Sequence, residues 1–286
     1  MAKLTRWSLS AERWHRFGTC RVRAGLSHWW PRILLAVAIG LNTGLIAANL
    51  SGSLFPADYR GYIAVVSSIG RDPFAVPGFR WSPLAAYLLI PVVLIGLTGW
   101  RVAHLALLVL LRDWRLVSVT LVAWPFWYDV RLGSTFFVAY ILAAAALGGS
   151  RWASVAYLGL FLVMPRPLML PVAAWLLWQR PRLLRLAALG LLFELGLLAA
   201  THELLPWVYA LVESTGEIAN PTNIGPSACV GSAWLILGVP LAIWLTWKGR
   251  LGLASLAASP YWLPYYLLFA LLELVPIRRR IGAKPQ

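Results

Sequence analysis

The sequence predicts an all-α protein that lies in a membrane as a helical bundle, with roughly eight to ten membrane segments. The first observation behind this prediction is composition: 60% of the 286 residues are hydrophobic and only 12% are charged. A water-soluble domain of this length does not need so much apolar surface. The second is that the apolar blocks are rich in Leu and Ala and show no period-two alternation, which favours helices over barrel strands.

The third observation is where the charges lie. The net charge is +15, but the basic residues form short clusters between the apolar blocks, as the positive-inside rule describes. They do not form the single basic surface that a nucleic acid would need. The 17 tryptophans, many of them near block ends, fit aromatic belts at the two membrane interfaces. The charge pattern therefore predicts a lipid bilayer, and no nucleic acid, as the partner.

Both termini are expected in the cytoplasm. Residues 1–32 are basic, and Ile33–Leu50 follows as a first span, which we interpret as a retained span and not as a cleaved signal peptide. The transmembrane domain is expected to cover 33–276, and a basic tail covers 277–286. Four basic clusters mark further cytoplasmic positions: Arg112/Arg115, Arg180/Arg182/Arg185, Lys248/Arg250 and Arg278–Arg280.

Between these anchors the apolar blocks are short, which predicts that some helices tilt into a protein-lined cavity. Pro83–Leu97 is expected to be one span, followed by a helix along the inner surface, Trp100–Leu111. Asp129–Arg131 and Pro165–Arg166 should be external turns among the four helices that come next. Those helices are Leu116–Tyr128, Leu132–Leu147, Trp152–Met164 and Leu168–Trp178.

The C-terminal part is expected to continue this pattern. Leu186–Ala200 runs outward, 201–230 forms a second external loop, and Gly231–Trp247 returns. Leu251–Pro276 is predicted to be a broken hairpin, because prolines interrupt its apolar run and a proline removes a hydrogen bond from the helical ladder.

The first external loop, 51–82, is the leading candidate for a site. It is a long polar interval between two strongly apolar blocks, and ionisable groups at a membrane face are costly unless they have a function. Arginine suits bidentate binding of phosphate oxygens, and a carboxylate beside it is able to act as a general base. The loop supplies both kinds of side chain: Asp58, Asp72, Arg60, Arg71 and Arg80.

Simpler interpretations of these residues stay open. Asp58 is also a good N-cap for a helix that starts at Tyr59, and interfacial arginines commonly anchor a loop to lipid headgroups. Asp72, which precedes a proline, is first of all a turn signal. Cys20 and Cys229 are expected on opposite sides of the membrane, so no disulfide is predicted, and no His or Cys cluster has the spacing of a metal site.

Four segments, taken in order, resemble glycosyltransferase family 87. The sequence D-Y-R-G-Y-I-A-V-V-S-S-I-G-R-D-P-F followed by F-R-W-S-P-L-A-A-Y-L-L-I-P is similar to the first external loop and second span of that family. R-L-G-S-T-F-F resembles its Gly-Gln segment, with Ser134 in place of Gln, and M-P-R-P resembles its Lys-Pro-x-Pro segment, with Met164 in place of Lys. S-P-Y-W-L-P-Y-Y resembles its late hairpin without the usual His. The resemblance spans roughly Phe55–Leu274.

The resemblance implies a GT-C type bundle and a specific activity. Such enzymes move a sugar, typically mannose, from a polyprenyl-phosphate carrier to a hydroxyl of a glycolipid or glycan on the extracytoplasmic side of the cell membrane, with inversion. It implies Asp58 as general base, and it makes Arg166, Arg131 and then Arg80 the candidates for holding the phosphate. Asp129, Tyr59 and Asp72 are further candidates for acceptor binding or for a second acid. The lipid-linked sugar is a substrate, and neither a metal nor a cofactor is expected.

Two other classes of function are open. A degenerate relative without catalytic activity could scaffold a larger membrane complex, and it would tolerate Asp58→Asn. A secondary transporter should show paired interrupted helices in two related halves, whereas the sequence has one interrupted hairpin, at Ser259-Pro260, and no convincing internal repeat. The transporter therefore fits the sequence least well.

Overall fold

The computed structural model describes residues 57–76, 79–213 and 223–277, and these form helices joined by turns and extended segments, without a strand. The prediction of an all-α architecture is therefore confirmed for the described part of the chain. The basic segment 1–32, the predicted first span Ile33–Leu50 and the tail from residue 278 onward lie outside the described residues.

The first described elements are α2 (Ala57–Ser67), the short 3₁₀ helix η1 (Pro73–Ala75), α3 (Leu84–Leu94) and α4 (Gly96–Leu107), which continues into η2 (Leu108–Leu111). The axis bends by 97° between α3 and α4. Gly96 has a φ of 72° at this bend, which glycine adopts without steric strain. Two helices were predicted here, and the structure places the break between them a few residues earlier.

The predicted helix Leu116–Tyr128 is wrong, because two helices occupy it: α5 (Trp114–Val122) and α6 (Trp124–Leu132). They are separated at Ala123, whose backbone is extended. Pro125 explains the break, since it has no N–H for the carbonyl oxygen one turn earlier and its ring crowds that turn. The Trp127 indole N–H instead donates to the Leu121 carbonyl oxygen, at 2.7 Å.

The predicted external turn Asp129–Arg131 is also wrong. These residues form the last turn of α6, which ends at Gly133, where φ is 66°. The elements that follow agree with the prediction to within a few residues. They are α7 (Phe136–Leu147), α8 (Arg151–Val163), η3 (Pro167–Met169) and α9 (Leu170–Gln179).

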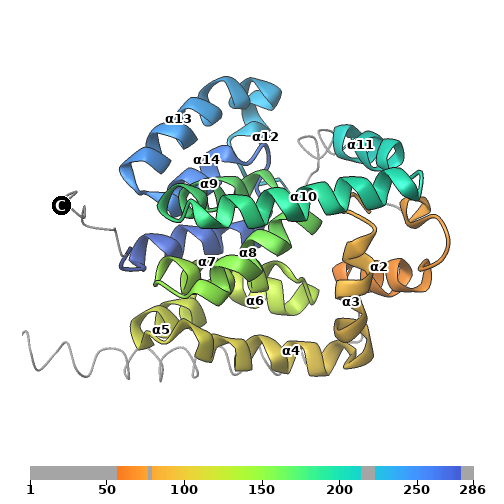
Figure 1. Ribbon diagram of the computed structural model, residues 1–286. Coiled ribbons are helices and arrows are strands. Elements are labelled where there is room, and N and C mark those ends of the chain that lie inside the picture. Colours follow the sequence, from red (N-terminus) through yellow and green to blue (C-terminus); the bar gives the residue numbers. More distant parts are fainter. Residues whose placement is uncertain (1–56, 77–78, 214–222, 278–286) are drawn as a thin grey trace, which may run out of the picture.

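Helix α7 forms the centre of the larger hydrophobic core. Nine of its 12 residues are buried, and alanines at positions 139, 143 and 146 allow close packing against neighbouring helices. In the view of Figure 1, α4 and α10 (Arg182–Ala200) flank the region of α6, α7 and α8 on opposite sides. The core therefore holds the N-terminus of α7 rigidly, and this end of α7 reaches the candidate site.

Among the described residues, two segments are long and apolar enough to cross a membrane: Arg182–Ala200, and Ser227–Lys248, which contains α12 (Ser227–Val230), η5 (Gly231–Ala233) and α13 (Trp234–Lys248). The bent pair α3 and α4 makes a third if it is one span. Only 11% and 17% of the most apolar 18-residue windows of the two segments is buried, so most of these side chains face outward. The remaining apolar helices are shorter than a full span. The predicted second external loop contains α11 (Leu204–Glu213).

The predicted broken hairpin is confirmed, as α14 (Leu251–Ala258) and the 3₁₀ helix η6 (Pro264–Leu274). The side chain of Asn223 stabilises the break between these two helices through hydrogen bonds. Its side-chain oxygen accepts hydrogen bonds from the backbone N–H groups of Gly225 and Trp262, both at 2.9 Å. Its side-chain amide donates to the Ser227 hydroxyl, at 2.9 Å. These hydrogen bonds position the start of η6, which carries the tyrosines of the candidate site.

Candidate functional site

The structure brings Asp58, Asp129 and Arg166 into one electrostatic cluster. Asp58 lies in the first turn of α2, Asp129 in α6, and Arg166 in the extended segment before η3. Both Asp129 and Arg166 act on the charge of Asp58. Three segments that are far apart in the sequence therefore supply two aspartates and an arginine to the same place.

Asp58 is partly exposed, and its environment changes its acidity. Burial raises the pKa of Asp58 from 3.8 to about 6, and the neighbouring charge of Asp129 adds to this increase. Arg166 and a hydrogen bond with the Ser134 hydroxyl act in the opposite direction on the same pKa. A carboxyl group with a pKa near 6 is ionised at neutral pH and is a stronger base than an ordinary aspartate.

Arg166 is held by aromatic rings. Its guanidinium carbon lies 5.3 Å from the ring centre of Trp81, 5.6 Å from that of Phe136 and 5.8 Å from that of Tyr266. Its Nη1 also donates to the Tyr266 hydroxyl, at 3.0 Å. The faces of these three aromatic rings attract the guanidinium cation, and this attraction does not use its N–H groups. The prolines on both sides of Arg166 favour the extended backbone observed there, with φ −132° and ψ 133°.

Several tyrosines complete the surroundings of Asp58. Tyr62 lies one helical turn after Asp58, and its hydroxyl accepts from the backbone N–H of Thr135, at 2.9 Å. Burial, and then the neighbouring charge of Asp58, raise the pKa of Tyr62. Tyr62 was not predicted as a site residue, although its i+4 spacing from Asp58 places the two on one helix face. That spacing is a signal in the sequence that could have identified it.

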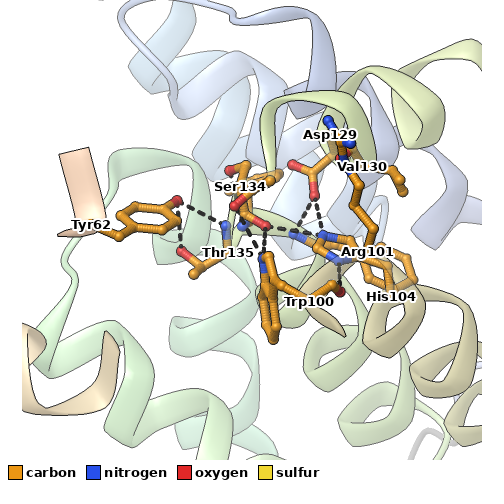
Figure 2. A network of polar contacts seen from close by, with 11 residues as sticks. Tyr62, Trp100, Arg101, His104, Asp129, Val130, Ser134 and Thr135 are labelled. Atoms are coloured by element: carbon orange, nitrogen blue, oxygen red, sulfur yellow. Dashed lines mark hydrogen bonds and ion pairs between the residues drawn. The ribbon is translucent and has the colours of Figure 1, made fainter. Parts of the chain in front are cut away.

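Asp129 forms a buried pair with His104. Both side chains are fully buried, and His104 Nε2 lies 3.2 Å from Oδ2 of Asp129. The backbone N–H of Phe137 also donates to Oδ2, at 3.3 Å. Figure 2 shows Ser134 and Thr135 between Tyr62 on one side and the His104–Asp129 pair on the other. The prediction that Asp129 is an external acid is therefore corrected, because an acceptor molecule cannot reach it directly.

Helix α4 fixes the segment that carries Asp129 and Ser134. The Trp100 indole N–H donates to the carbonyl oxygens of Gly133 and Ser134, at 3.1 and 3.3 Å (Figure 2). Arg101 donates to the carbonyl oxygens of Val130 and Arg131, at 3.2 and 2.9 Å. Both carbonyl groups lie in the last turn of α6, where the helix ends and its own N–H donors run out. A cation at a helix C-terminus also interacts favourably with the helix dipole.

The other predicted site residues lie as follows. The Tyr59 hydroxyl donates to the Val93 carbonyl oxygen, at 3.3 Å, and the side chain is 3% exposed. Asp72 is exposed and accepts from the backbone N–H of Phe74, at 2.9 Å, so it caps η1 as a turn residue does. Arg131 is exposed at the end of α6, and Arg80 is half-buried next to Trp81.

The described residues contain no group of three or more His, Cys, Asp or Glu side chains that could hold a metal ion. Comparison of the chain with protein-family models, with curated proteins and with solved structures finds no match. The arrangement of the residues themselves therefore carries the functional argument that follows.

Proposed function

We propose that the protein is an integral membrane glycosyltransferase with a GT-C type bundle. It would move a sugar, with mannose as the first candidate, from a polyprenyl-phosphate carrier to a hydroxyl of a glycolipid or glycan on the extracytoplasmic face. The observation that carries the proposal is that Asp58, with a pKa of about 6, shares its surroundings with an arginine held by aromatic rings. The motif resemblance, which names the same two residues, supports it.

In this proposal Asp58 is the general base. Its carboxylate takes the proton of the acceptor hydroxyl while the acceptor oxygen attacks the anomeric carbon of the sugar. The bond between that carbon and the phosphate oxygen breaks, and its electron pair leaves with the polyprenyl phosphate. Attack opposite to the leaving group inverts the anomeric carbon. General base catalysis of this kind typically contributes about 10²–10⁴-fold to a rate.

Arg166 is proposed to bind the leaving phosphate. A guanidinium group has about five N–H donors, and the hydrogen bond described for Arg166 uses one of them, with the Tyr266 hydroxyl. The rings of Trp81, Phe136 and Tyr266 hold the cation through their faces. N–H groups thus stay available for phosphate oxygens, and the charge would stabilise the negative charge that develops as phosphate leaves.

A membrane location fits both the substrate and the surface of the protein. Large apolar side chains on α10 and α13 are exposed, among them Leu189, Phe193, Ile236 and Ile243. Such a continuous apolar surface is expected to face lipid. We propose a multi-pass protein of the cell membrane with both termini in the cytoplasm, so that a prenyl chain could reach the site from within the bilayer.

The test is sugar transfer in membranes that contain the protein, with radiolabelled polyprenyl-phosphate mannose and extracted lipids. The wild type should transfer label to a new lipid, whereas Asp58→Asn should lose about 10²–10⁴-fold of the rate. Asp72→Asn is the matched control, because it changes the same residue type at an exposed turn. Equal rates in Asp58→Asn and the wild type would contradict the assigned base.

One observation favours a second candidate, a non-catalytic membrane subunit. Met164, which replaces the lysine of the resembling family motif, is 6% exposed and packs in the smaller hydrophobic core. A polar family position has thus become part of the core. Absence of transfer by the folded wild type with a range of acceptors, together with full function of Asp58→Asn in cells, would favour this candidate.

A further inference from the structure

The hydroxyl of Tyr266 lies between two other polar groups, and their chemistry fixes the direction of its hydrogen bonds. Nη1 of Arg166 lies 3.0 Å from the Tyr266 oxygen, and the Tyr261 oxygen lies 3.4 Å from it. A guanidinium group is able only to donate, so the Tyr266 oxygen accepts from Arg166 and has its own proton left to give. Tyr266 therefore donates to Tyr261, whose oxygen uses a lone pair in this contact.

The proton of the Tyr261 hydroxyl is consequently left over. No group in the described part of the chain accepts it. Tyr261 is half-buried, and its ring centre lies 5.7 Å from that of Tyr266, so the hydroxyl stays beside the aromatic rings that hold Arg166. The site thus offers an O–H donor next to a guanidinium group.

Hydrogen bonds fix the backbone around Tyr261. Its carbonyl oxygen accepts from the Ser259 hydroxyl. The N–H of Trp262 donates to Oδ1 of Asn223, at 2.9 Å, and the Trp262 indole N–H donates to the Leu256 carbonyl oxygen, at 2.8 Å. A donor that is held in place before a ligand arrives loses little conformational freedom on binding. The break between α14 and η6 therefore presents the Tyr261 hydroxyl in a defined position.

No acid of the described residues forms an ion pair with Arg166. Within this part of the chain, the acids that contact a basic side chain are Asp129, paired with His104, and Glu273, paired with Arg250. A phosphate group is a favoured partner for a guanidinium group, because its oxygens accept charge-assisted hydrogen bonds. An incoming phosphate would meet two kinds of donor together, a guanidinium and a phenol.

We propose that Tyr261 is a second phosphate-binding residue, whose hydroxyl donates to an oxygen of the same phosphate group that Arg166 binds. Arg166 and Tyr261 both contact the Tyr266 hydroxyl, so different oxygens of one phosphate are able to reach both. Tyr266 is a positioning residue, because it keeps the two donors side by side and leaves the Tyr261 proton for the ligand. The identity of the phosphate as that of a lipid-linked sugar rests on the proposed function, whereas phosphate binding itself requires no transfer.

Phosphate binding can be measured without a sugar, by calorimetric titration of farnesyl phosphate, a short prenyl phosphate, into the full chain in lipid nanodiscs. Empty nanodiscs give the background. Tyr261→Phe keeps the ring and removes only the hydroxyl, so the Kd should rise about 10-fold, as for the loss of one hydrogen bond to a charged group. Tyr87→Phe, which changes an exposed tyrosine of α3, is the matched control and should bind as the wild type does.

Farnesol and inorganic phosphate separate the two parts of the ligand. Farnesol has the same apolar chain without the phosphate, so Tyr261→Phe should leave its binding unchanged. Equal weakening of farnesol and farnesyl phosphate would show that Tyr261 only shapes an apolar groove, and an unchanged Kd for farnesyl phosphate would equally overturn the proposal. Inorganic phosphate should bind more weakly than farnesyl phosphate. Equal affinity would assign the site to free phosphate and overturn the lipid-linked ligand.

Tyr266→Phe tests the positioning role. It removes the link between Arg166 and Tyr261, so adding Tyr261→Phe to this variant should weaken farnesyl phosphate by clearly less than 10-fold. Additive effects would overturn the positioning role, and Tyr261→Phe alone decides the binding role if Tyr266→Phe does not fold.

The outcomes separate this proposal from the proposed function. Phosphate binding of the expected pattern without sugar transfer would refute the transferase alone. Sugar transfer together with an unchanged Kd in Tyr261→Phe would refute the role of Tyr261 alone. A wild type that does not bind farnesyl phosphate would overturn the phosphate roles of Arg166 and Tyr261 together.

Discussion

At the scale of single residues, the acidity of Asp58 links the stability of the protein to its proposed activity. Burial and Asp129 raise its pKa from 3.8 to about 6, so the folded protein binds this proton more tightly than the unfolded chain does. The contribution of Asp58 to the free energy of unfolding is therefore present below about pH 4 and is lost as the pH rises through about 6. At neutral pH the carboxylate lowers stability, as is common for functional groups.

Asp58→Asn should therefore be at least as stable as the wild type at pH 7.5, because an amide has no charge to bury, although the proposed function requires the variant to be inactive. Thermal unfolding in detergent, followed at pH 5 and pH 7.5, measures this. The gain of the variant over the wild type should be larger at pH 7.5. A variant that is clearly less stable than the wild type at pH 7.5 would show that the carboxylate is a structural cap, which is the simpler interpretation of this residue.

The pH dependence of sugar transfer should follow the same group. In the proposed function the base works as a carboxylate, so the rate should fall as the pH drops through about 6. Arg166→Gln removes the charge that favours the carboxylate, so it should shift this fall to higher pH and also lower the maximal rate by about 10²–10³-fold. The pH–rate profile under saturating donor gives both quantities. A fall that is centred near pH 4 would contradict the environment described for Asp58.

At the scale of elements, close helix packing holds the hairpin that carries the tyrosines. A Cβ atom at Gly252 of α14 would overlap the backbone carbonyl oxygen of Phe269 in η6, and backbone is not able to move aside as a flexible side chain does. At Gly196 of α10, by contrast, a Cβ would meet nothing within 4 Å. Gly252 therefore allows the close approach of two helices, whereas no neighbouring atom requires a glycine at position 196.

Gly252→Ala should lower the free energy of unfolding by about 1–3 kcal/mol, the usual range for overpacking. Gly196→Ala should be neutral or should raise it by about 0.5–1 kcal/mol, because alanine is the better helix former. Denaturation of the two variants in the same detergent measures the difference. If both changes had the same effect, the close approach of α14 and η6 would not be important for stability.

The elements also show how far the sequence could predict this site. Asp58 and Arg166 lie in local motifs that the sequence displays directly. The His104–Asp129 pair was missed because its members are on different helices, and only the packing of α4 against α6 and α7 brings them together. The end of α5 was missed for a simpler reason. Pro125 ends α5 through its local effect on the preceding turn, which is a signal that the sequence itself carries.

At the scale of the whole molecule, the outer surface agrees with a protein surrounded by lipid. Helix α10 exposes Leu189 at 64% and Phe193 at 69%, while Glu194 and Leu198 on its inner face are 2% and 1% exposed. The one acid in this apolar helix thus points into the protein, where a carboxyl group at membrane depth is expected to lie. Composition predicted a membrane protein, but which face of α10 is exposed follows only from the packed structure.

A spin label at Phe193 should therefore be accessible to oxygen, which concentrates in the bilayer, and inaccessible to a polar nickel reagent. The label is introduced as Phe193→Cys in a chain whose two native cysteines are serine, reconstituted in nanodiscs. Thr201→Cys, just past the end of α10 and exposed, is the control and should show the reverse accessibility. If the label at position 193 meets the nickel reagent as readily as the control does, α10 faces water, and the apolar surface must instead be covered by another protein. A prenyl chain would then have no lipid route to Asp58 along this helix.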